Sequence, residues 1–455
     1  MSIIDVSTDY ILSSNHLLPL VNGQNILRFP DFTLENGTVI KEVSVGYKTW
    51  GTLNEERNNC MVICHAFTGS SDVADWWGPL LGKGRSFDTS RFFVVCVNVL
   101  GSPYGSSSPL TINPDTGKPY GPEFPLTSIR DDVALHRRVL DYLGVKQVAI
   151  CIGGSLGGMH CLEWATFGRE YVRTIIPIAT SGKHSAWGIS WGEAQRQMIY
   201  SDPYYNDGYY TRNQEPINGL SVARMSALLT YRSRDSFESR FGRKEVSVVP
   251  KSTSRTTSVP GSARNSISSV TSINNNDPNV GYTSSEEDFS EYISQPISQI
   301  DDRSASRLFS AQSYLRYQGD KFTKRFDANC YIALAKKMDT HDLGKSRGDY
   351  FKVLESINQP ALVVGIETDG LFTFNEQIEL ASYMPNSKLS RIESYDGHDG
   401  FLLEFEQLNI LIRSFIAQHL PEFFNPEAVD VGTLSEHVSL KGSVFGEVES
   451  GLSKW

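Results

Sequence analysis

Apolar positions along the chain occur in short continuous runs, and segments with helical spacing separate several of them. Val and Ile dominate the runs, which is typical of strands in a parallel sheet covered on both faces. The five clearest runs are residues 60–67, 91–101, 145–154, 172–180 and 361–369. The pattern therefore predicts an α/β protein whose mostly parallel sheet has helices on both faces.

A crossover helix is predicted between the second and third runs. Apolar residues recur there at steps of three and four from residue 129 to residue 143. Ser128 and Asp131 are placed as a capping pair, and Gly144 is placed to end the helix. His136 falls on the apolar face, which favours a core histidine with a satisfied hydrogen bond over a catalytic one.

One long segment, residues 244–306, lacks this pattern and is rich in Ser, Thr and Asn. A segment with so few apolar residues is expected to be disordered. Its flanks, residues 219–241 and 310–339, have a helical and aromatic character. We expect the flanks to form a helical cap that holds the two ends of the segment close together.

The length of 455 residues exceeds what one compact core usually holds. The pattern indicates one enlarged domain rather than two separate ones. The predicted core comprises residues 1–182 and 346–455, and the cap, with the Ser-rich insertion inside it, comprises residues 183–345.

Charge and segment composition exclude several classes of partner. The 42 Lys and Arg residues against 52 Asp and Glu residues give a net charge of −10, which offers no basic surface for nucleic acid or anionic membranes. Asp5 and Asp9 lie where a secretory signal carries basic residues, and no apolar run reaches the roughly 18 residues of a membrane span. The sequence predicts a cytoplasmic protein.

The six cysteines are too sparse for a disulfide framework, and Cys64, Cys96 and Cys151 each lie in an apolar run. Buried reduced thiols are therefore expected. Cys60 and Cys64 lie four apart, but no second ligand pair with suitable spacing exists, so no metal site is predicted.

The third apolar run ends in "GGSLG", residues 153–157, which fits the G-x-S-x-G turn that presents a nucleophilic serine between a strand and a helix. Gly153 and Gly157 would supply the dihedral freedom and the space that a tight turn needs. A helix starting near Leu156 would direct its N–H groups toward Ser155. The alternative is a plain glycine-rich turn. A phosphate-binding loop is not predicted, because Lys83 is followed by Gly and not by the Ser or Thr that such a loop requires.

An acid and a histidine follow later in the chain order that this nucleophile requires. Asp369 ends the fifth run, and His398 follows a further predicted strand in "LSRIESYDGHDGF", just before a helix predicted to start near Phe401. His398 would act as the general base for Ser155, and Asp369 would orient it. Two alternatives remain: Asp369 as a turn residue before Gly370, and His341 as a rival base.

A series of ordered motifs resembles the homoserine O-acetyltransferases, specifically the fungal branch. The motifs are "YKTWGTLN", "HAFTGSSDVADWWGPL", "NVLGSPYGSSSPLT", "YGPEFPL", "GGSLGGM", "SWGEAQRQMIYSDP", "ARMSALLTYRS", "DANCYIA", "DGLF" and "GHDGFLLEF". The resemblance covers nearly the whole chain outside the insertion. It implies the α/β-hydrolase fold, transfer of acetyl from acetyl-CoA to the homoserine hydroxyl in methionine biosynthesis, no permanently bound cofactor, and a homodimer.

The same resemblance assigns catalytic roles residue by residue. It implies Ser155 as nucleophile, Asp369 as acid and His398 as base, in agreement with the motif reasoning. The oxyanion hole would consist of the backbone N–H groups of Phe67 and Leu156.

For the acceptor, the resemblance implies that Arg224 and Tyr231 bind the homoserine carboxylate and that Asp399 binds its ammonium group. Seven residues are nearly two helical turns, so Arg224 and Tyr231 can project from one helix into one pocket. The alternatives are an exposed helix arginine at position 224 and a helix-capping role for Asp399.

Other reactions stay open at this stage. A small change in the binding pocket could convert a homoserine O-acetyltransferase into a serine O-acetyltransferase or a homoserine O-succinyltransferase. An esterase or thioesterase would share Ser155, Asp369 and His398 but would not need residues that bind an amino acid.

Overall fold

The computed structural model describes residues 3–6, 15–246 and 308–427. The Ser-rich segment predicted to be disordered, residues 244–306, lies almost entirely outside the described residues. The predicted domain boundaries after residues 182 and 345 stay predictions.

Nine strands of the described chain form one central sheet. Their order is β1 (Ile4–Asp5), β2 (Asn25–Arg28), β5 (Ser44–Trp50), β7 (Phe93–Val97), β6 (Cys60–Cys64), β8 (Val148–Gly154), β9 (Val172–Ile178), β12 (Ala361–Ile366) and β13 (Ser387–Ile392). The strands from β7 to β13 run parallel, and β1, β2 and β5 add an antiparallel edge that the sequence analysis did not predict. All five predicted runs are strands. A small hairpin joins β3 (Asp31–Thr33) to β4 (Val39–Lys41).

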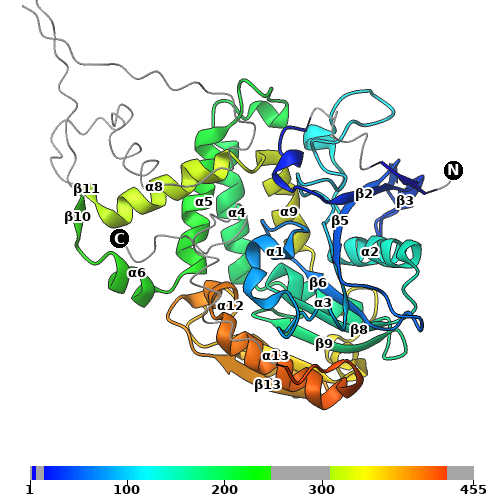
Figure 1. Cartoon of the computed structure of the whole chain (residues 1–455). Coiled ribbons are helices and arrows are strands. Elements are labelled where there is room, and N and C mark those ends of the chain that lie inside the picture. Colours follow the sequence, from blue (N-terminus) through cyan, green and yellow to red (C-terminus); the bar gives the residue numbers. More distant parts are fainter. Residues whose placement is uncertain (1–2, 7–14, 247–307, 428–455) are drawn as a thin grey trace, which may run out of the picture.

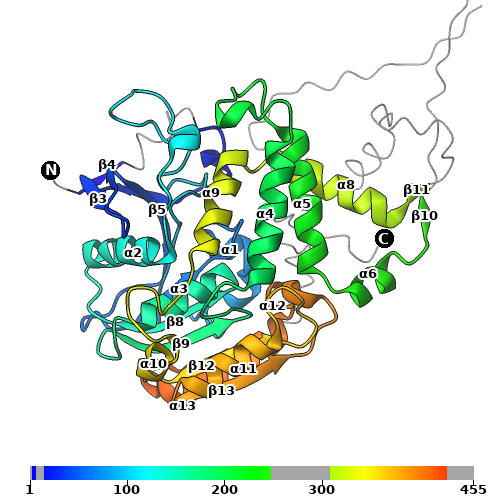
Figure 2. The ribbon, with the colours of Figure 1, turned by 180° about the vertical axis from the view of Figure 1, so that it is seen from behind.

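Helices cover both faces of the sheet, as the continuous apolar runs predict (Figures 1 and 2). One face packs against α1 (Val73–Trp76) and α13 (Phe405–His419). The other packs against α2 (Ile129–Leu143), α3 (Leu156–Ala165), α10 (Tyr350–Ser356) and α11 (Phe374–Tyr383). Met61 and Ile63 of β6 face the first group, whereas Val62 faces the second. The inner strands of the sheet therefore need apolar residues on both faces.

The predicted crossover helix is α2, and its ends are as predicted. Ser128 and Asp131 form a reciprocal capping box, and Gly144 ends the helix with φ of 82°. His136 is a core histidine that stacks on His160, with ring centroids 5.9 Å apart. The prediction of a satisfied hydrogen bond is wrong for its Nε2 atom, which has no hydrogen-bond partner among the described residues. Burial lowers the pKa of His136 to about 3, so the ring is neutral.

A helical cap is inserted in the chain between β9 and β12, which are neighbours in the sheet. It consists of α4 (Ala186–Tyr200), α5 (Ile217–Tyr231), α6 (Arg234–Arg240), β10 (Glu245–Val246), β11 (Leu308–Phe309), α8 (Ser310–Thr323) and α9 (Ala328–Asp339). Figure 1 shows these green and yellow elements beside the sheet. Strand β10 pairs antiparallel with β11, so the two ends of the Ser-rich segment lie next to each other, as predicted.

Short helical turns complete the described chain. They are α12 (Gly400–Leu403) and the 3-10 turns Leu18–Leu20, Gly78–Leu80, Gly121–Glu123, Asn206–Gly208, Gly397–Asp399 and Pro421–Phe423. Among the described residues, no helix has the length and apolar character needed to cross a membrane.

Candidate active site

Ser155 occupies a strained turn between β8 and α3. Its φ of 58° is positive, a conformation that costs a residue other than glycine about 1–3 kcal/mol. Its backbone N–H donates to the carbonyl of Ile178 at 3.0 Å, which fixes the turn against the next strand. This geometry presents the Ser155 side chain at the carboxyl end of the sheet, as the G-x-S-x-G motif predicts.

The two glycines of the motif provide space rather than unusual dihedral angles. A β-carbon on Gly153 would lie 2.5 Å from the carbonyl oxygen of Gly157, and one on Gly157 would lie 2.1 Å from that of Cys64. Neither glycine has a positive φ. The expectation that they supply dihedral freedom is therefore wrong, because Ser155 itself takes that conformation.

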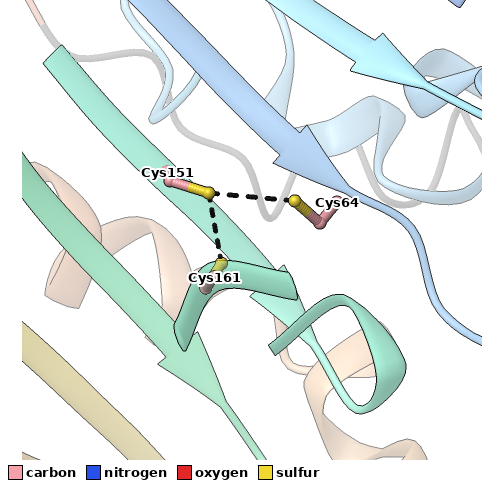
Figure 3. Close-up of side chains that lie close together, drawn as sticks. All are labelled: Cys64, Cys151 and Cys161. Atoms are coloured by element: carbon pink, nitrogen blue, oxygen red, sulfur yellow. Dashed lines mark hydrogen bonds between the residues drawn. The ribbon is translucent and has the colours of Figure 1, made fainter. Parts of the chain in front are cut away.

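Three buried thiols lie beneath this turn. Figure 3 shows Cys64, Cys151 and Cys161 pointing toward one another from β6, β8 and α3, with Sγ distances of 3.8 Å for Cys64–Cys151 and 3.5 Å for Cys151–Cys161. All six cysteines are buried and free, which confirms the expectation of reduced thiols. The spacing analysis missed this grouping, whose sulfur atoms all lie within 4.8 Å of one another. These described residues offer three ligands, whereas structural zinc takes four. The absence of a metal site stays a prediction.

Asp369 and His398 form a buried pair. The His398 Nδ1–H donates to Asp369 Oδ2 at 2.7 Å. The other carboxylate oxygen accepts the backbone N–H groups of Leu371 and Phe372 at 2.8 Å and 2.9 Å. Asp369 is thus both a turn residue and the partner of His398, and the two readings of the sequence hold together.

The surroundings of His398 favour its protonated form. Burial opposes the charge, but the charge of Asp369, the hydrogen bond to it and the charge of Asp399 outweigh burial, and the pKa of His398 is raised above its ordinary value. With Nδ1–H held by Asp369, the neutral ring carries its lone pair on Nε2. That atom is the one a general base uses.

His341, the rival base, lies elsewhere. It is buried and shares a hydrogen bond between its Nε2 and the carbonyl of Ser181 at 3.1 Å. Burial lowers its pKa to about 4. It lines neither of the two cavities that border Ser155.

Two cavities meet at Ser155 and share the side chains of Phe67 and Tyr231. The first, of about 510 Å³, also contains Arg224, His398 and Asp399. The second, of about 460 Å³, lies between α4 and α9. Its lining includes His184, Trp191, Gln195, Met338, Asp339 and Leu371. The structure therefore gathers the predicted serine, base and acceptor residues around one space. No hydrogen bond joins Ser155 to His398 in this arrangement, and such bonds commonly close only with substrate.

The predicted oxyanion donors flank the serine. Phe67 follows β6, and Leu156 is the first residue of α3, where helical N–H groups have no partner within the helix. Within the described part of the chain, neither backbone N–H donates to a protein acceptor. The Phe67 ring packs edge-on against Tyr331, with centroids 5.0 Å apart. Both donors are therefore available to an oxygen held beside Ser155.

Arg224 and Tyr231 project from α5 into the first cavity, as predicted. The guanidinium lies 5.5 Å from the ring centroid of Tyr231 and 5.0 Å from that of Phe322. Arg224 is 2% exposed, so the alternative of an exposed helix arginine is wrong. Aromatic faces hold this cation in place beside the serine.

Asp399 is paired with an arginine that sequence reasoning missed. Arg232 Nε lies 2.7 Å from Asp399 Oδ2, and its Nη1 lies 2.8 Å from Asp396 Oδ1, which Arg240 also contacts. Asp399 precedes α12 but makes no side-chain capping bond, so the capping alternative is wrong. The only available signal was that Arg232 directly follows Tyr231 in the motif "LTYRS".

Comparisons with known proteins agree with this geometry. The α/β hydrolase fold family matches residues 59–405. Homoserine O-acetyltransferase from Saccharomyces pastorianus is 49% identical over 99% of this chain and 98% of its own length. The same-named protein from Emericella nidulans is 51% identical over 97% and 96%. Among solved structures, esterase E22 superposes with a TM-score of 0.70 at 25% identity, covering 86% of this chain and 99% of that one.

Proposed function

The chain belongs to the homoserine O-acetyltransferases of the α/β-hydrolase fold, and we propose that it transfers acetyl from acetyl-CoA to the L-homoserine hydroxyl in methionine biosynthesis. One observation carries this proposal from the structure. Ser155, His398 and the buried cation Arg224 line a single cavity, which joins a nucleophile and its base to a binding site for an anionic acceptor.

In the first half-reaction, Ser155 attacks the thioester. His398 Nε2 takes the Ser155 hydroxyl proton as Oγ bonds to the acetyl carbonyl carbon. The N–H groups of Phe67 and Leu156 stabilise the resulting oxyanion. The carbon–sulfur bond breaks, CoA leaves with the proton from His398, and acetyl-serine remains.

In the second half-reaction, homoserine attacks the acetyl-serine. Arg224 and Tyr231 bind the acceptor carboxylate, and Asp399 receives its ammonium group. His398 removes the hydroxyl proton, the new ester bond forms, and the proton returns to Ser155 as the bond to its Oγ breaks. The cap disfavours water, which separates a transferase from a hydrolase on this fold.

We also propose a cytoplasmic homodimer that uses acetyl-CoA only as a substrate, with no permanently bound cofactor. Large apolar side chains exposed on the cap helices support the dimer. They are Trp187 of α4 and Ile217, Val222 and Leu229 of α5, each about half exposed. Such side chains favour association where they form one contiguous patch. Size-exclusion chromatography with light scattering measures the mass, and a monomer at working concentration contradicts this part.

The decisive experiment offers purified protein acetyl-CoA or succinyl-CoA together with homoserine, serine or no acceptor. Thiol release and product mass identify both substrates. Ser155→Ala should abolish transfer and the acetyl adduct on the protein seen by mass spectrometry. One thiol per active site is expected without an acceptor, because acylation precedes homoserine binding. Continued thiol release over many turnovers without any acceptor would instead indicate hydrolysis by an esterase or thioesterase; the structural neighbour E22 is an esterase.

A further inference from the structure

The second cavity is built along one face of α4. Gly188, Trp191, Gly192 and Gln195 recur at helical spacing, and all four line it. Glycine is disfavoured inside a helix, so two glycines on this stripe need a reason. A β-carbon on Gly188 would lie 2.4 Å from His184 Cε1, and one on Gly192 would lie 3.3 Å from Arg196 Nη1. The glycines therefore let the side chains of His184 and Arg196 lie close against the helix at the wall of this cavity.

The polar groups around this cavity are left incompletely bonded. Gln195 Oε1 accepts the Tyr331 hydroxyl at 2.7 Å, while its amide N–H groups bond to no described residue. Trp191 Nε1, His184 Nδ1 and Asp339 Oδ1 are buried and without a hydrogen-bond partner among the described residues. Buried polar groups normally find partners, so this cluster suits a ligand with its own donors and acceptors.

The cavity offers no net charge to such a ligand. Burial lowers the pKa of His184 to about 4, so its ring is neutral near pH 7. The Asp339 carboxylate is paired with Arg196, whose Nη2 lies 2.7 Å from Oδ2. Arg196 also binds Glu193, which is half exposed and does not line the cavity. Phe67, Met338 and Leu371 form apolar walls.

The first cavity differs in charge. It presents a buried cation, Arg224, and a buried carboxylate, Asp399, one oxygen of which is paired with Arg232 at 2.7 Å. The cation can bind the carboxylate of a free amino acid, and the remaining Asp399 oxygen can receive its ammonium group. Both cavities border Ser155 and Phe67, so a carbonyl group can reach the nucleophile and one oxyanion donor from either side.

Resting on the proposed function, we propose that the second cavity binds the pantetheine arm of the acyl donor. This arm is an uncharged chain with two amides, which matches the neutral, incompletely bonded lining. The acceptor then uses the first cavity, and Gln195 and Trp191 act as donor-specificity residues in the acylation half-reaction alone.

The test separates the two half-reactions. In a two-step transfer, kcat/KM for acetyl-CoA reports acylation, and kcat/KM for homoserine reports the second step. Gln195→Glu keeps the acceptor for Tyr331 but removes the amide donor. Gly192→Leu fills the cavity. Gln197→Ala is the control on the exposed face of the same helix, because it removes only a surface hydrogen bond to Glu193 and adds no charge.

We expect Gln195→Glu to lower kcat/KM for acetyl-CoA about tenfold, the usual scale for one lost hydrogen bond to a ligand. Gly192→Leu should lower it further. For both variants, kcat/KM for homoserine and the burst of acylation by p-nitrophenyl acetate, an acetyl donor without pantetheine, should stay at the wild-type level. Thermal unfolding checks that each variant is folded.

Three results overturn the assignment. Unchanged kcat/KM for acetyl-CoA in two folded variants would show that the arm lies elsewhere. A loss in kcat/KM for homoserine alone would show that the second cavity binds the acceptor instead of the donor. An equal loss with p-nitrophenyl acetate would place the defect in Ser155 chemistry. Wild-type protein acylated by p-nitrophenyl acetate but not by acetyl-CoA would instead overturn the proposed function itself.

Discussion

Asp369→Asn tests whether the buried carboxylate orients the base. The amide oxygen can keep both backbone N–H groups that Asp369 Oδ1 accepts. The amide nitrogen, however, donates where Oδ2 accepted His398 Nδ1–H at 2.7 Å. The ring proton must therefore move to Nε2, which can then no longer take the proton of Ser155.

The size of the effect follows from this change of tautomer. The same isosteric change in a serine-protease triad lowers kcat by about 10⁴, which is about 5.5 kcal/mol at about 1.36 kcal/mol per tenfold. The pH dependence shifts too. The charge of Asp369 and its hydrogen bond raise the pKa of His398 against burial, so their removal lowers that pKa. The acid limb of acylation should move to lower pH.

Rapid mixing of enzyme with acetyl-CoA, followed by thiol release at a series of pH values, measures both effects. Asp349→Asn is the matched control, since Asp349 also accepts a backbone N–H, that of Lys352 at a helix start, but has no histidine partner. That variant should behave as wild type. A rate loss below about tenfold in Asp369→Asn, or an acid limb that stays in place, would refute the orienting role.

Three further predictions concern the acceptor, the buried ion pair and the insertion. Arg224→Ala should lower kcat/KM for homoserine by an amount equivalent to about 1.5–3 kcal/mol, while the rate of Ser155 acylation stays unchanged. An equal loss in the acylation rate would show that Arg224 does not bind the acceptor. Arg232→Met removes the cation that lies 2.7 Å from the buried Asp399 carboxylate and should lower the free energy of unfolding by about 3–5 kcal/mol, measured with denaturant. Arg232→Met with Asp399→Leu should recover stability but not homoserine use. Replacement of residues 247–307 by a short Gly/Ser linker should preserve transfer and the thermal midpoint, because β10 and β11 already pair at its ends; loss of most activity would contradict this.

The strands and the nucleophile turn were predictable from the sequence. A strand such as β8, buried on both faces, needs an apolar or small residue at every position, and this leaves a continuous run. The turn at Ser155 has a local cause as well, since its close contacts exclude any side chain at Gly153 and Gly157. Chain order then selected Asp369 and His398, because this fold fixes the order of the three residues.

The antiparallel edge of the sheet was not predicted, and its strands explain why. Strand β2 has two half-buried ends around two buried residues, and β1 is exposed. Four or fewer residues of mixed burial give no distinct period, and only pairing makes them strands: β2 pairs with β5, and β1 pairs with β2.

Tertiary structure alone decided the side-chain pairings that the sequence analysis missed. Arg232 and Asp399 are separated by more than 160 residues in the sequence, and Cys64, Cys151 and Cys161 come from three elements. Periodicity along a chain reports how each element is buried, because burial repeats with the local geometry of a helix or strand. Pairings between elements, and the two cavities that meet at Ser155, depend on how those elements pack in space, and no local repeat in the sequence records that packing.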